Sequence, residues 1–249
     1  MRTDLKTAQG PTGGTVGGPV ARGVPSPAPD RLRMNPIYFL GWCLFRFCFA
    51  VYFRWRADHP ERVPLTGPVI LAANHASYVD PPLVGAGLRR PCSFLAREDL
   101  FDIPIVGWLL REWSVVPVNR EGGGAAGLRA ILDRLLAGHA VVLFPEGTRS
   151  PDGRLQRARL GIGLLVAKST APVVPVRVFG SHDAWPKGSK FAKPRRVVVK
   201  YGQPMTFDAS RAEAKTCSKA RLKEIYQQIA EEIMGAISRL EARENEGAA

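Results

Sequence analysis

From residue 68 onward, short apolar runs alternate with amphipathic segments. Apolar runs bounded by turn residues are typical of buried strands, and apolar positions three and four apart are typical of helices that cover a sheet. We therefore expect strands at 69–73, 92–96, 114–118, 140–144, 173–178 and 196–201, and helices at 82–87, 105–111, 125–136, 160–169 and 209–241. This order predicts an α/β fold with a largely parallel central sheet flanked by helices.

The segment before these elements, residues 37–55, is apolar and aromatic almost all round. As a helix it would extend roughly 28 Å, close to the thickness of a hydrocarbon core. Arg46 falls in its middle, and a charge at the bilayer centre costs about 2.5 kcal/mol or more. Aromatic residues near both ends favour a membrane-anchoring helix that lies in one leaflet. A spanning helix and a buried core helix are the alternatives.

The pattern divides the chain into three parts. Residues 1–33 are rich in Gly, Pro, Thr and Ala and contain no apolar run, so we expect a disordered leader and no secretory signal peptide. Met34 opens the segment that resembles folded protein and is a candidate natural start. Residues 34–60 are the predicted membrane-associating helical segment. Residues 61–249 are the predicted α/β domain, because 45% hydrophobic content suffices for one core of this size.

The formal net charge of +13 favours an anionic partner: nucleic acid, an anionic membrane surface or a phosphorylated substrate. Aromatic-rich RNA-binding motifs, helix-turn-helix spacing and paired-cysteine zinc patterns are missing from the sequence, so we expect no nucleic-acid partner. The four cysteines are scattered, without a C-x-x-C pair or a neighbouring histidine. They indicate reduced thiols of a cytosolic compartment and no metal site.

The strongest chemical candidate is a histidine with a carboxylate, just after the predicted strand 69–73. His75 and Asp80 are five residues apart, and this spacing puts side chains about 140° apart on a regular helix, so they meet only if the chain turns between them. Pro81 and Pro82 indicate the start of a helix and place Asp80 near its N-cap. A histidine held by a carboxylate can take a proton from a hydroxyl. A capping Asp80 beside a structural His75 is the alternative.

A second polar cluster follows the predicted strand 140–144. It offers an acceptor, a flexible turn, a hydroxyl and a planar cation, a set that suits a phosphate or a polyol: Glu146, Gly147, Thr148 and Arg149. Arg120, directly after the predicted strand 114–118, is a further candidate for gripping phosphate, or a solvated surface charge. Both clusters lie at carboxyl ends of predicted strands, where ligand sites of parallel sheets gather.

Four ordered motifs across about residues 35–205 resemble those of the glycerolipid acyltransferases, above all the 1-acylglycerol-3-phosphate (lysophosphatidic acid) acyltransferases. They are Asn74-His75 with Asp80, Val118-Asn119-Arg120, Phe144-Pro145-Glu146-Gly147-Thr148-Arg149, and Val174-Pro175-Val176 leading to Gly180. The resemblance implies that His75 is the general base and that Asp80 orients it. It also implies direct attack of the acceptor hydroxyl on an acyl thioester, which fits the absence of a G-x-S-x-G elbow from the sequence.

The resemblance also implies which residues bind substrate. Those expected to hold the acceptor are Arg97, Arg120, Glu146, Gly147, Thr148 and Arg149, while Asn74 and Pro175 would shape the pocket. Arg97 stands where the family often has a lysine, and Arg157 and Arg159 stand where an aromatic residue and a lysine are common. These departures keep the positive charge and leave the acceptor head group open.

The implied function is transfer of a fatty acyl group from acyl-CoA or acyl carrier protein to the free hydroxyl of 1-acylglycerol-3-phosphate, giving phosphatidic acid for phospholipid biosynthesis. The implied partners are membrane lipids, lysophosphatidic acid and the acyl donor, and the implied location is the cytoplasmic face of the inner (plasma) membrane. No metal or other cofactor is expected. The alternatives are acylation of another lysolipid or an amine-bearing lipid, a non-catalytic lipid-binding membrane protein, and a thioesterase or lipase.

A basic run surrounds Trp185 and Phe191. It comprises Lys187, Lys190, Lys193, Arg195, Arg196 and Lys200. We expect this run to face the membrane, where each cation near an anionic leaflet adds about 1 kcal/mol. A solvated loop is the alternative.

Overall fold

The computed structural model describes residues 34–118 and 125–241. The predicted leader 1–33 and Arg120 therefore lie outside the described residues.

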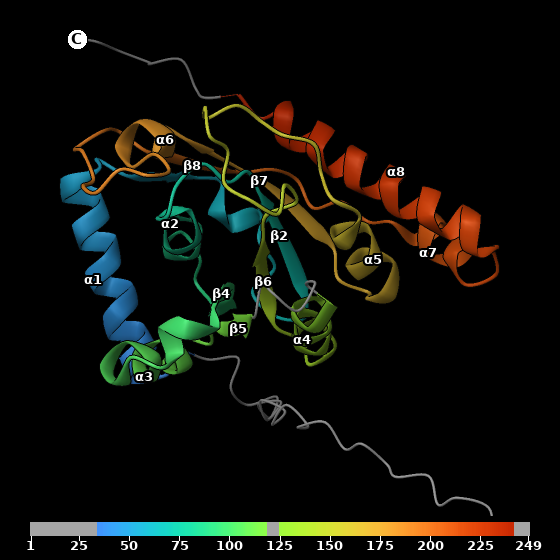
Figure 1. Cartoon of the computed structure of the whole chain (residues 1–249), viewed down its shortest axis with the longest axis horizontal. Helices are drawn as coiled ribbons and strands as arrows, with labels where there is room; N and C mark the ends of the chain where they lie inside the picture. Colours follow the sequence, from blue (N-terminus) through green and yellow to red (C-terminus); the bar gives the residue numbers. More distant parts are fainter. Residues whose placement is uncertain (1–33, 119–124, 242–249) are drawn as a thin grey trace, which may run out of the picture.

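A six-stranded sheet in the order β1-β8-β7-β2-β6-β3 forms the centre of the molecule (Figure 1). Among its described pairs only β7 and β8 run antiparallel. The six strands are β1 (Arg56–Asp58), β2 (Val69–Ala73), β3 (Cys92–Ser93), β6 (Ala140–Leu143), β7 (Val173–Phe179) and β8 (Val198–Tyr201). The predicted α/β fold with a largely parallel sheet is confirmed.

Two details of the strands differ from expectation. The predicted strand 92–96 is two strands: β3 joins the main sheet, whereas β4 (Leu95–Arg97) pairs in parallel with β5 (Val116–Val118) in a separate small sheet. The unpredicted β1 pairs with β8. Residues 56–58 thus belong to the sheet, although they fall within the segment 34–60 that was expected to be helical.

Eight α-helices surround the sheet within the described residues (Figure 1). They are α1 (Pro36–Tyr52), α2 (Asp80–Ala86), α3 (Pro104–Glu112), α4 (Ala125–Leu136), α5 (Leu160–Lys168), α6 (Ser181–Ala184), α7 (Asp208–Ala214) and α8 (Lys219–Ser238). Short 3₁₀ turns occupy Pro60–Arg62 and Glu98–Phe101. The helix predicted at 209–241 is two helices, because the Ser218 side chain accepts a hydrogen bond from the Arg221 N–H (3.3 Å) and caps a new start.

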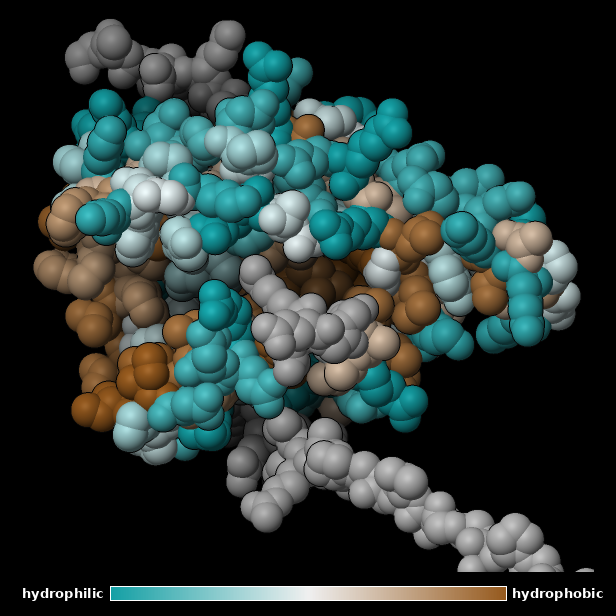
Figure 2. All heavy atoms as spheres, in the orientation of Figure 1, coloured by the Kyte–Doolittle hydropathy of each residue, from teal (hydrophilic) through white to brown (hydrophobic). Residues whose placement is uncertain are grey.

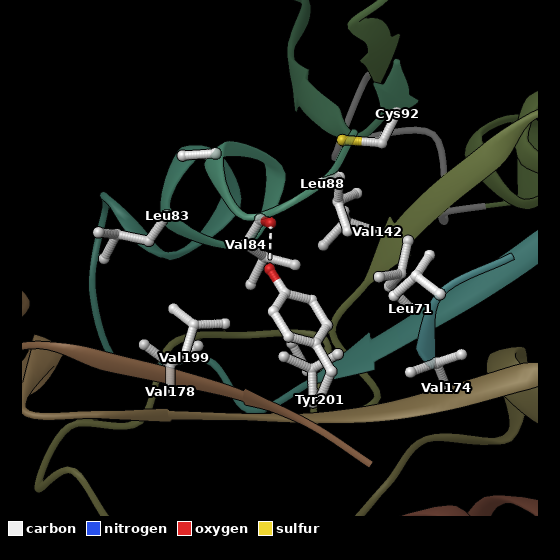
Figure 3. Close-up of a cluster of buried hydrophobic side chains, with 14 of the residues drawn as sticks. Leu71, Leu83, Val84, Leu88, Cys92, Val142, Val174, Val178, Val199 and Tyr201 are labelled. Carbon is white, nitrogen blue, oxygen red and sulfur yellow. Dashed lines mark hydrogen bonds between the residues drawn. The ribbon is translucent and has the colours of Figure 1, made fainter. Parts of the chain in front are cut away.

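The sheet has a buried core on each face. Every residue of β2 is buried, as expected for a central parallel strand covered on both sides. One core joins the sheet to α2 and the end of α1, and in it the Tyr201 hydroxyl donates to the Val84 carbonyl at 2.6 Å (Figure 3). The other core joins the sheet to α4, α5 and α8. At the α5–α8 contact, a Cβ on Gly163 would lie 2.0 Å from the Tyr226 carbonyl oxygen, so only glycine fits there.

Helix α1 has one face on the protein and one face open. The Arg46 guanidinium points inward: it donates to the Ala86 carbonyl (2.7 Å) and lies over the rings of Trp42 and Trp55. The open face carries apolar side chains, Phe39, Leu40, Leu44, Phe47 and Val51. These exposed residues contradict the alternative of a buried core helix. No helix in the described ranges combines the length and apolarity needed to cross a bilayer.

Helix α3 extends this apolar surface. Ile105 and Trp108 are exposed on it, and Trp113 at its end packs edge-on against Phe45 of α1. Figure 2 shows apolar side chains gathered along the edge of the molecule formed by α1 and α3. We call the exposed apolar residues of these two helices the apolar edge.

Candidate active site

The site begins where β2 ends. The Asn74 side chain accepts from the Val178 N–H (2.7 Å) and donates to the Val178 carbonyl (3.1 Å), which ties the end of β2 to β7. Asn74 thus fixes the backbone from which the next residue, His75, projects. These two hydrogen bonds are consistent with the pocket-shaping role predicted for Asn74, which stays a prediction.

His75 and Asp80 meet as predicted. The His75 Nδ1 lies 2.9 Å from the Asp80 Oδ2, and the same oxygen accepts from the backbone N–H groups of Ala76 and Ser77, both at 2.7 Å. Asp80 is the first residue of α2, and its fully buried side chain points back over the preceding turn. Val79 is the N-cap, and the Asp80 side chain makes its hydrogen bonds to the turn before the helix, while the catalytic role of the pair stays a prediction.

This contact sets the chemistry of the imidazole. Because the carboxylate accepts from Nδ1–H, the Nε2 nitrogen is left as the proton acceptor. The imidazole stacks on the Phe144 ring, with centroids 4.0 Å apart, and stays 16% exposed. The ring is thus fixed on two sides and open to a substrate on a third.

Glu146 is a structural neighbour of His75. The side chain is only 3% exposed, and its Oε1 accepts from the His75 N–H at 3.1 Å. Burial raises the pKa of Glu146 to about 7, against the lowering effect of hydrogen bonds from the backbone of His75 and Gln156. A carboxyl buried in this way has no open face for a substrate, so the expected role of Glu146 in substrate binding is not supported by its position.

In the rest of the Glu146–Arg149 turn, the two middle residues are exposed and Arg149 is half-buried. Gly147 has a φ of +69°, and a Cβ there would meet the Arg159 side chain at 2.7 Å. Thr148 is exposed. The Arg149 guanidinium lies over the Tyr78 ring, 3.4 Å from its centroid, and its Nη1 has no hydrogen-bond partner in the described part of the chain. Cations at Arg149 and Arg159 thus flank this turn.

Two residues near the site, Tyr78 and Arg159, were not predicted from sequence as site residues. Tyr78 lies inside the turn between His75 and Asp80, and aromatic faces are common seats for guanidinium groups, but the spacing gave no partner for it. Arg159 was noted only as a departure from the family pattern. Its contact with Gly147 depends on the start of α5, where the Arg159 N–H donates to the Pro145 carbonyl at 2.8 Å.

The remaining predicted residues lie further out. The Arg97 side chain is exposed and bonds the Asp99 carboxylate through two nitrogens (2.6 and 2.9 Å). Pro175 is buried in β7 opposite Ala72, and its ring lies against Gly202. Their roles stay predictions. Within the described ranges, no three His, Cys, Asp or Glu side chains are grouped as metal ligands.

Comparison with known proteins gives consistent relatives. A chloroplastic 1-acyl-sn-glycerol-3-phosphate acyltransferase from Brassica napus is 33% identical over 164 residues, covering 65% of this chain and 47% of the relative. A lyso-ornithine lipid O-acyltransferase from Pseudomonas aeruginosa is 30% identical over 135 residues, half of each chain. This chain thus spans about half the length of these curated relatives.

A solved structure and a family model complete the comparison. The crystal structure of the 1-acyl-sn-glycerophosphate acyltransferase PlsC from Thermotoga maritima is 26% identical, with a TM-score of 0.63, and the match covers 83% of this chain and 82% of that one. The model of the Acyltransferase family matches residues 54–179, which include both polar clusters. The chain therefore belongs to the Acyltransferase family.

Proposed function

We propose that this protein transfers a fatty acyl group from an acyl thioester to the free hydroxyl of 1-acylglycerol-3-phosphate, giving phosphatidic acid for phospholipid biosynthesis. The observation that carries the proposal is the His75–Asp80 contact, which leaves a proton acceptor at Nε2, with the half-buried Arg149 guanidinium over Tyr78 of the same turn. The names of the relatives support the same reaction. Acyl-CoA and acyl carrier protein are both candidate donors.

The mechanism needs one base and one leaving group. The acceptor hydroxyl oxygen attacks the thioester carbonyl carbon while His75 Nε2 takes the hydroxyl proton. Asp80 keeps the proton on Nδ1 and stabilises the imidazolium that develops. The tetrahedral intermediate then collapses: the carbon–sulfur bond breaks, and the departing sulfur takes the proton from the His75 imidazolium and leaves as the thiol. The N–H groups of Ala76 and Ser77 already donate to Asp80, so they are not available to the oxyanion. No metal or other cofactor is required for these steps.

The phosphate of the acceptor would bind at the turn that follows β6. The Arg149 guanidinium is held over Tyr78, and Arg159 covers Gly147 of the same turn. Planar guanidinium groups match phosphate oxygens in pairs. In 1-acylglycerol-3-phosphate the short glycerol backbone keeps the phosphate close to the reacting hydroxyl, so a phosphate at this turn places the hydroxyl near His75.

The acyl chains would occupy apolar space between α1, α2 and α3. A cavity of about 230 Å³ lies there, and its lining includes Tyr38, Trp42, Phe45, Ala86, Phe94 and Trp113. The cavity reaches α2, whose first residue is Asp80. An aliphatic chain in this cavity would thus extend from the reacting carbonyl toward the apolar edge.

The apolar edge is the proposed membrane contact, with α1 lying in one leaflet on the cytoplasmic face of the inner (plasma) membrane. Leu40 and Phe47 are 71% and 68% exposed, and apolar side chains at a bilayer surface stabilise binding in proportion to the area they bury. Because Arg46 is paired inside the protein, no charged side chain of α1 interrupts the open face of this helix. Lys187 and Lys190, exposed near the end of α1, would add attraction to anionic lipid.

Liposome flotation tests this contact. We expect Leu40→Asp with Phe47→Asp to leave the protein in the soluble fraction, whereas Leu136→Asp, at an equally exposed leucine of α4, floats like the wild type. Equal flotation of the α1 variant and the wild type would refute the proposed contact.

A second acceptor class is a lysolipid with an amine-bearing head group. The relative from Pseudomonas aeruginosa is named for a lyso-ornithine lipid, and the arginines at positions 97, 157 and 159 differ from the residues common in the family. The same base and the same attack would serve this acceptor. Only the groups that bind the head group would differ.

Transfer of a labelled acyl group, followed by mass spectrometry, tests the function. Purified protein is given acyl-CoA or acyl carrier protein with a panel of lysolipids. We expect transfer to 1-acylglycerol-3-phosphate and a loss of at least about 10²-fold in His75→Ala, the lower range for removal of a general base. Full activity in this variant would rule out the mechanism. Preference for lyso-ornithine lipid would select the second acceptor class.

A further inference from the structure

A basic hollow opens beside α6, at the end of β7. It has a volume of about 480 Å³, and its lining includes His182, Asp183, Pro186, Lys193, Arg195 and Arg196. This volume falls within the range of small-molecule sites in proteins. We call it the basic hollow.

The charges of this hollow favour a ligand with several phosphate oxygens. Lys193, Arg195 and Arg196 contribute three cations against the single carboxylate of Asp183. Cations that converge on a concave surface attract phosphate more strongly than the same cations spread over a flat one.

The loop that carries these cations is fixed. The Tyr52 hydroxyl of α1 donates to the Ala192 carbonyl (2.8 Å), and the Lys193 N–H donates to the Ala184 carbonyl of α6 (2.7 Å). The Trp185 indole N–H donates to the Ser189 carbonyl (3.0 Å). A fixed backbone lowers the entropy cost of arranging the cations around a ligand.

The six cations of the basic run noted in the sequence lie in different places in the structure. Lys187 and Lys190 are exposed and do not line the hollow. Lys200 lies on β8, and its Nζ donates to the Glu241 carbonyl at 2.8 Å. Lys200 therefore lies in the sheet, apart from the loop that carries the other five cations, and the membrane-facing position of the run stays a prediction.

The hollow adjoins the His75 site through two contacts. Ser77, two residues after His75, donates from its hydroxyl to the Trp185 carbonyl (2.8 Å) and pairs with Pro186, which lines the hollow. On the other side Gly153 lies against the His182 ring, so the turn that follows Arg149 forms a second shared wall. Trp185 therefore lies where the walls of the two sites meet.

Among the proposed substrates, the pantetheine arm of the acyl donor has the length to reach from one site to the other, and coenzyme A is the donor whose arm ends in several phosphate groups. The phosphate of 1-acylglycerol-3-phosphate lies close to the reacting hydroxyl, which places it near Arg149. In acyl-CoA the long pantetheine arm separates the thioester from the nucleotide phosphates. We propose that the basic hollow binds the phosphates of the coenzyme A nucleotide, with the pantetheine arm running past Trp185 to His75. This inference rests on the proposed acyl transfer and names its donor.

The test combines direct binding with kinetics on the full chain. The variant is Lys193→Glu with Arg195→Glu, and the matched control is Lys215→Glu with Lys223→Glu, which makes the same charge change on exposed lysines at α7 and α8. Calorimetry measures binding of coenzyme A and of pantetheine, which lacks the nucleotide. Kinetics compare acyl-CoA, acyl-pantetheine and acyl carrier protein as donors, and flotation measures binding to anionic vesicles.

We expect the hollow variant to weaken coenzyme A binding and raise KM for acyl-CoA by at least about tenfold, since loss of a single charge-assisted hydrogen bond already costs about that factor. The kcat, and KM for acyl-pantetheine, should stay within about twofold of the wild type. The control variant should bind coenzyme A like the wild type.

Three results would overturn the inference. Equal coenzyme A binding by the hollow variant and its control would exclude the nucleotide from the hollow. A loss confined to acyl carrier protein would make the surface a protein-docking site, and a loss confined to anionic vesicles would make it a lipid contact. The calorimetric arm needs no turnover: coenzyme A binding that depends on the hollow, without transfer to any lysolipid, would refute the proposed function and keep the site.

Discussion

Replacing Glu146 by glutamine separates its structural role from its ionisation. The carboxyl is buried, its Oε1 accepts from the His75 N–H, and its Oε2 has no hydrogen-bond partner among the described residues. Burial raises its pKa from 4.5 to about 7. Glutamine has nearly the same shape and keeps a carbonyl acceptor for His75, but it does not titrate.

The difference between these pKa values sets the size of the effect. It corresponds to about 3 kcal/mol, because one pKa unit is 1.36 kcal/mol. The folded protein binds the Glu146 proton more tightly than the unfolded chain does, so raising the pH from 4.5 to about 7 favours the unfolded state. The wild type should therefore lose up to about 3 kcal/mol of stability across this window, and Glu146→Gln should not lose this contribution.

Denaturant unfolding followed by tryptophan fluorescence measures the effect. We expect Glu146→Gln to gain stability relative to the wild type as the pH rises from about 4.5 to about 8. The difference in the free energy of unfolding, variant minus wild type, should increase by up to about 3 kcal/mol. Glu232→Gln, on the exposed face of α8, controls for the loss of a surface carboxyl. If the difference in free energy of unfolding between Glu146→Gln and the wild type stays constant with pH, the pKa of the buried carboxyl is not raised. If the difference decreases as the pH rises, the pKa is lowered and the prediction is wrong.

Three further predictions use other parts of the structure. Asp80→Asn should lower kcat by roughly 10²–10⁴-fold with the fold kept, because it retains an acceptor but removes the charge that stabilises the imidazolium; unchanged kcat with a native circular-dichroism spectrum would contradict this. Gly163→Ala should cost about 1–3 kcal/mol in denaturant unfolding, whereas Gly235→Ala, which meets only the end of the flexible Arg239 side chain, should stabilise α8 by up to about 1 kcal/mol; equal effects would refute the close α5–α8 contact. Arg159→Ala should raise KM for 1-acylglycerol-3-phosphate about tenfold without changing KM for the acyl donor, and a rise for both substrates would refute a phosphate-binding role.

The central strands and the contact between His75 and Asp80 were predictable because their signals are local. Val69–Ala73 is an unbroken apolar run, and burial on both faces is the condition that requires one. The two prolines after Asp80 mark the start of α2, so the turn that joins His75 to Asp80 follows from a short stretch of sequence. The three-residue β1, Arg-Ala-Asp, carries no such signal, because its position depends on pairing with β8 across the fold.

The orientation of polar side chains was less predictable. Arg46, in the middle of an apolar segment, gains its partners from residues far along the chain, with Ala86 supplying the carbonyl that accepts from it. Glu146 and Arg149 lie in one turn, yet the first points into the core toward His75 and the second points out over Tyr78. Sequence spacing gives the order of such residues, whereas their direction depends on the elements packed around the turn.

The two carboxyl groups around His75 contact different parts of it: Asp80 contacts the imidazole ring, and Glu146 contacts the backbone N–H. The Asp80 Oδ2 collects three hydrogen bonds from the turn that carries the imidazole, so the same contact that orients the ring also fixes the backbone beneath it. Glu146 supports the His75 N–H from the other side, and Asp80 contributes to raising its pKa, since a second negative charge in the same buried region is unfavourable. When Glu146 is protonated, the buried region around the His75 backbone holds the charge of Asp80 without a second negative charge beside it. In the proposed mechanism Asp80 balances the charge of the imidazolium through Nδ1, so the proton on Nε2 stays free to pass to the departing thiolate.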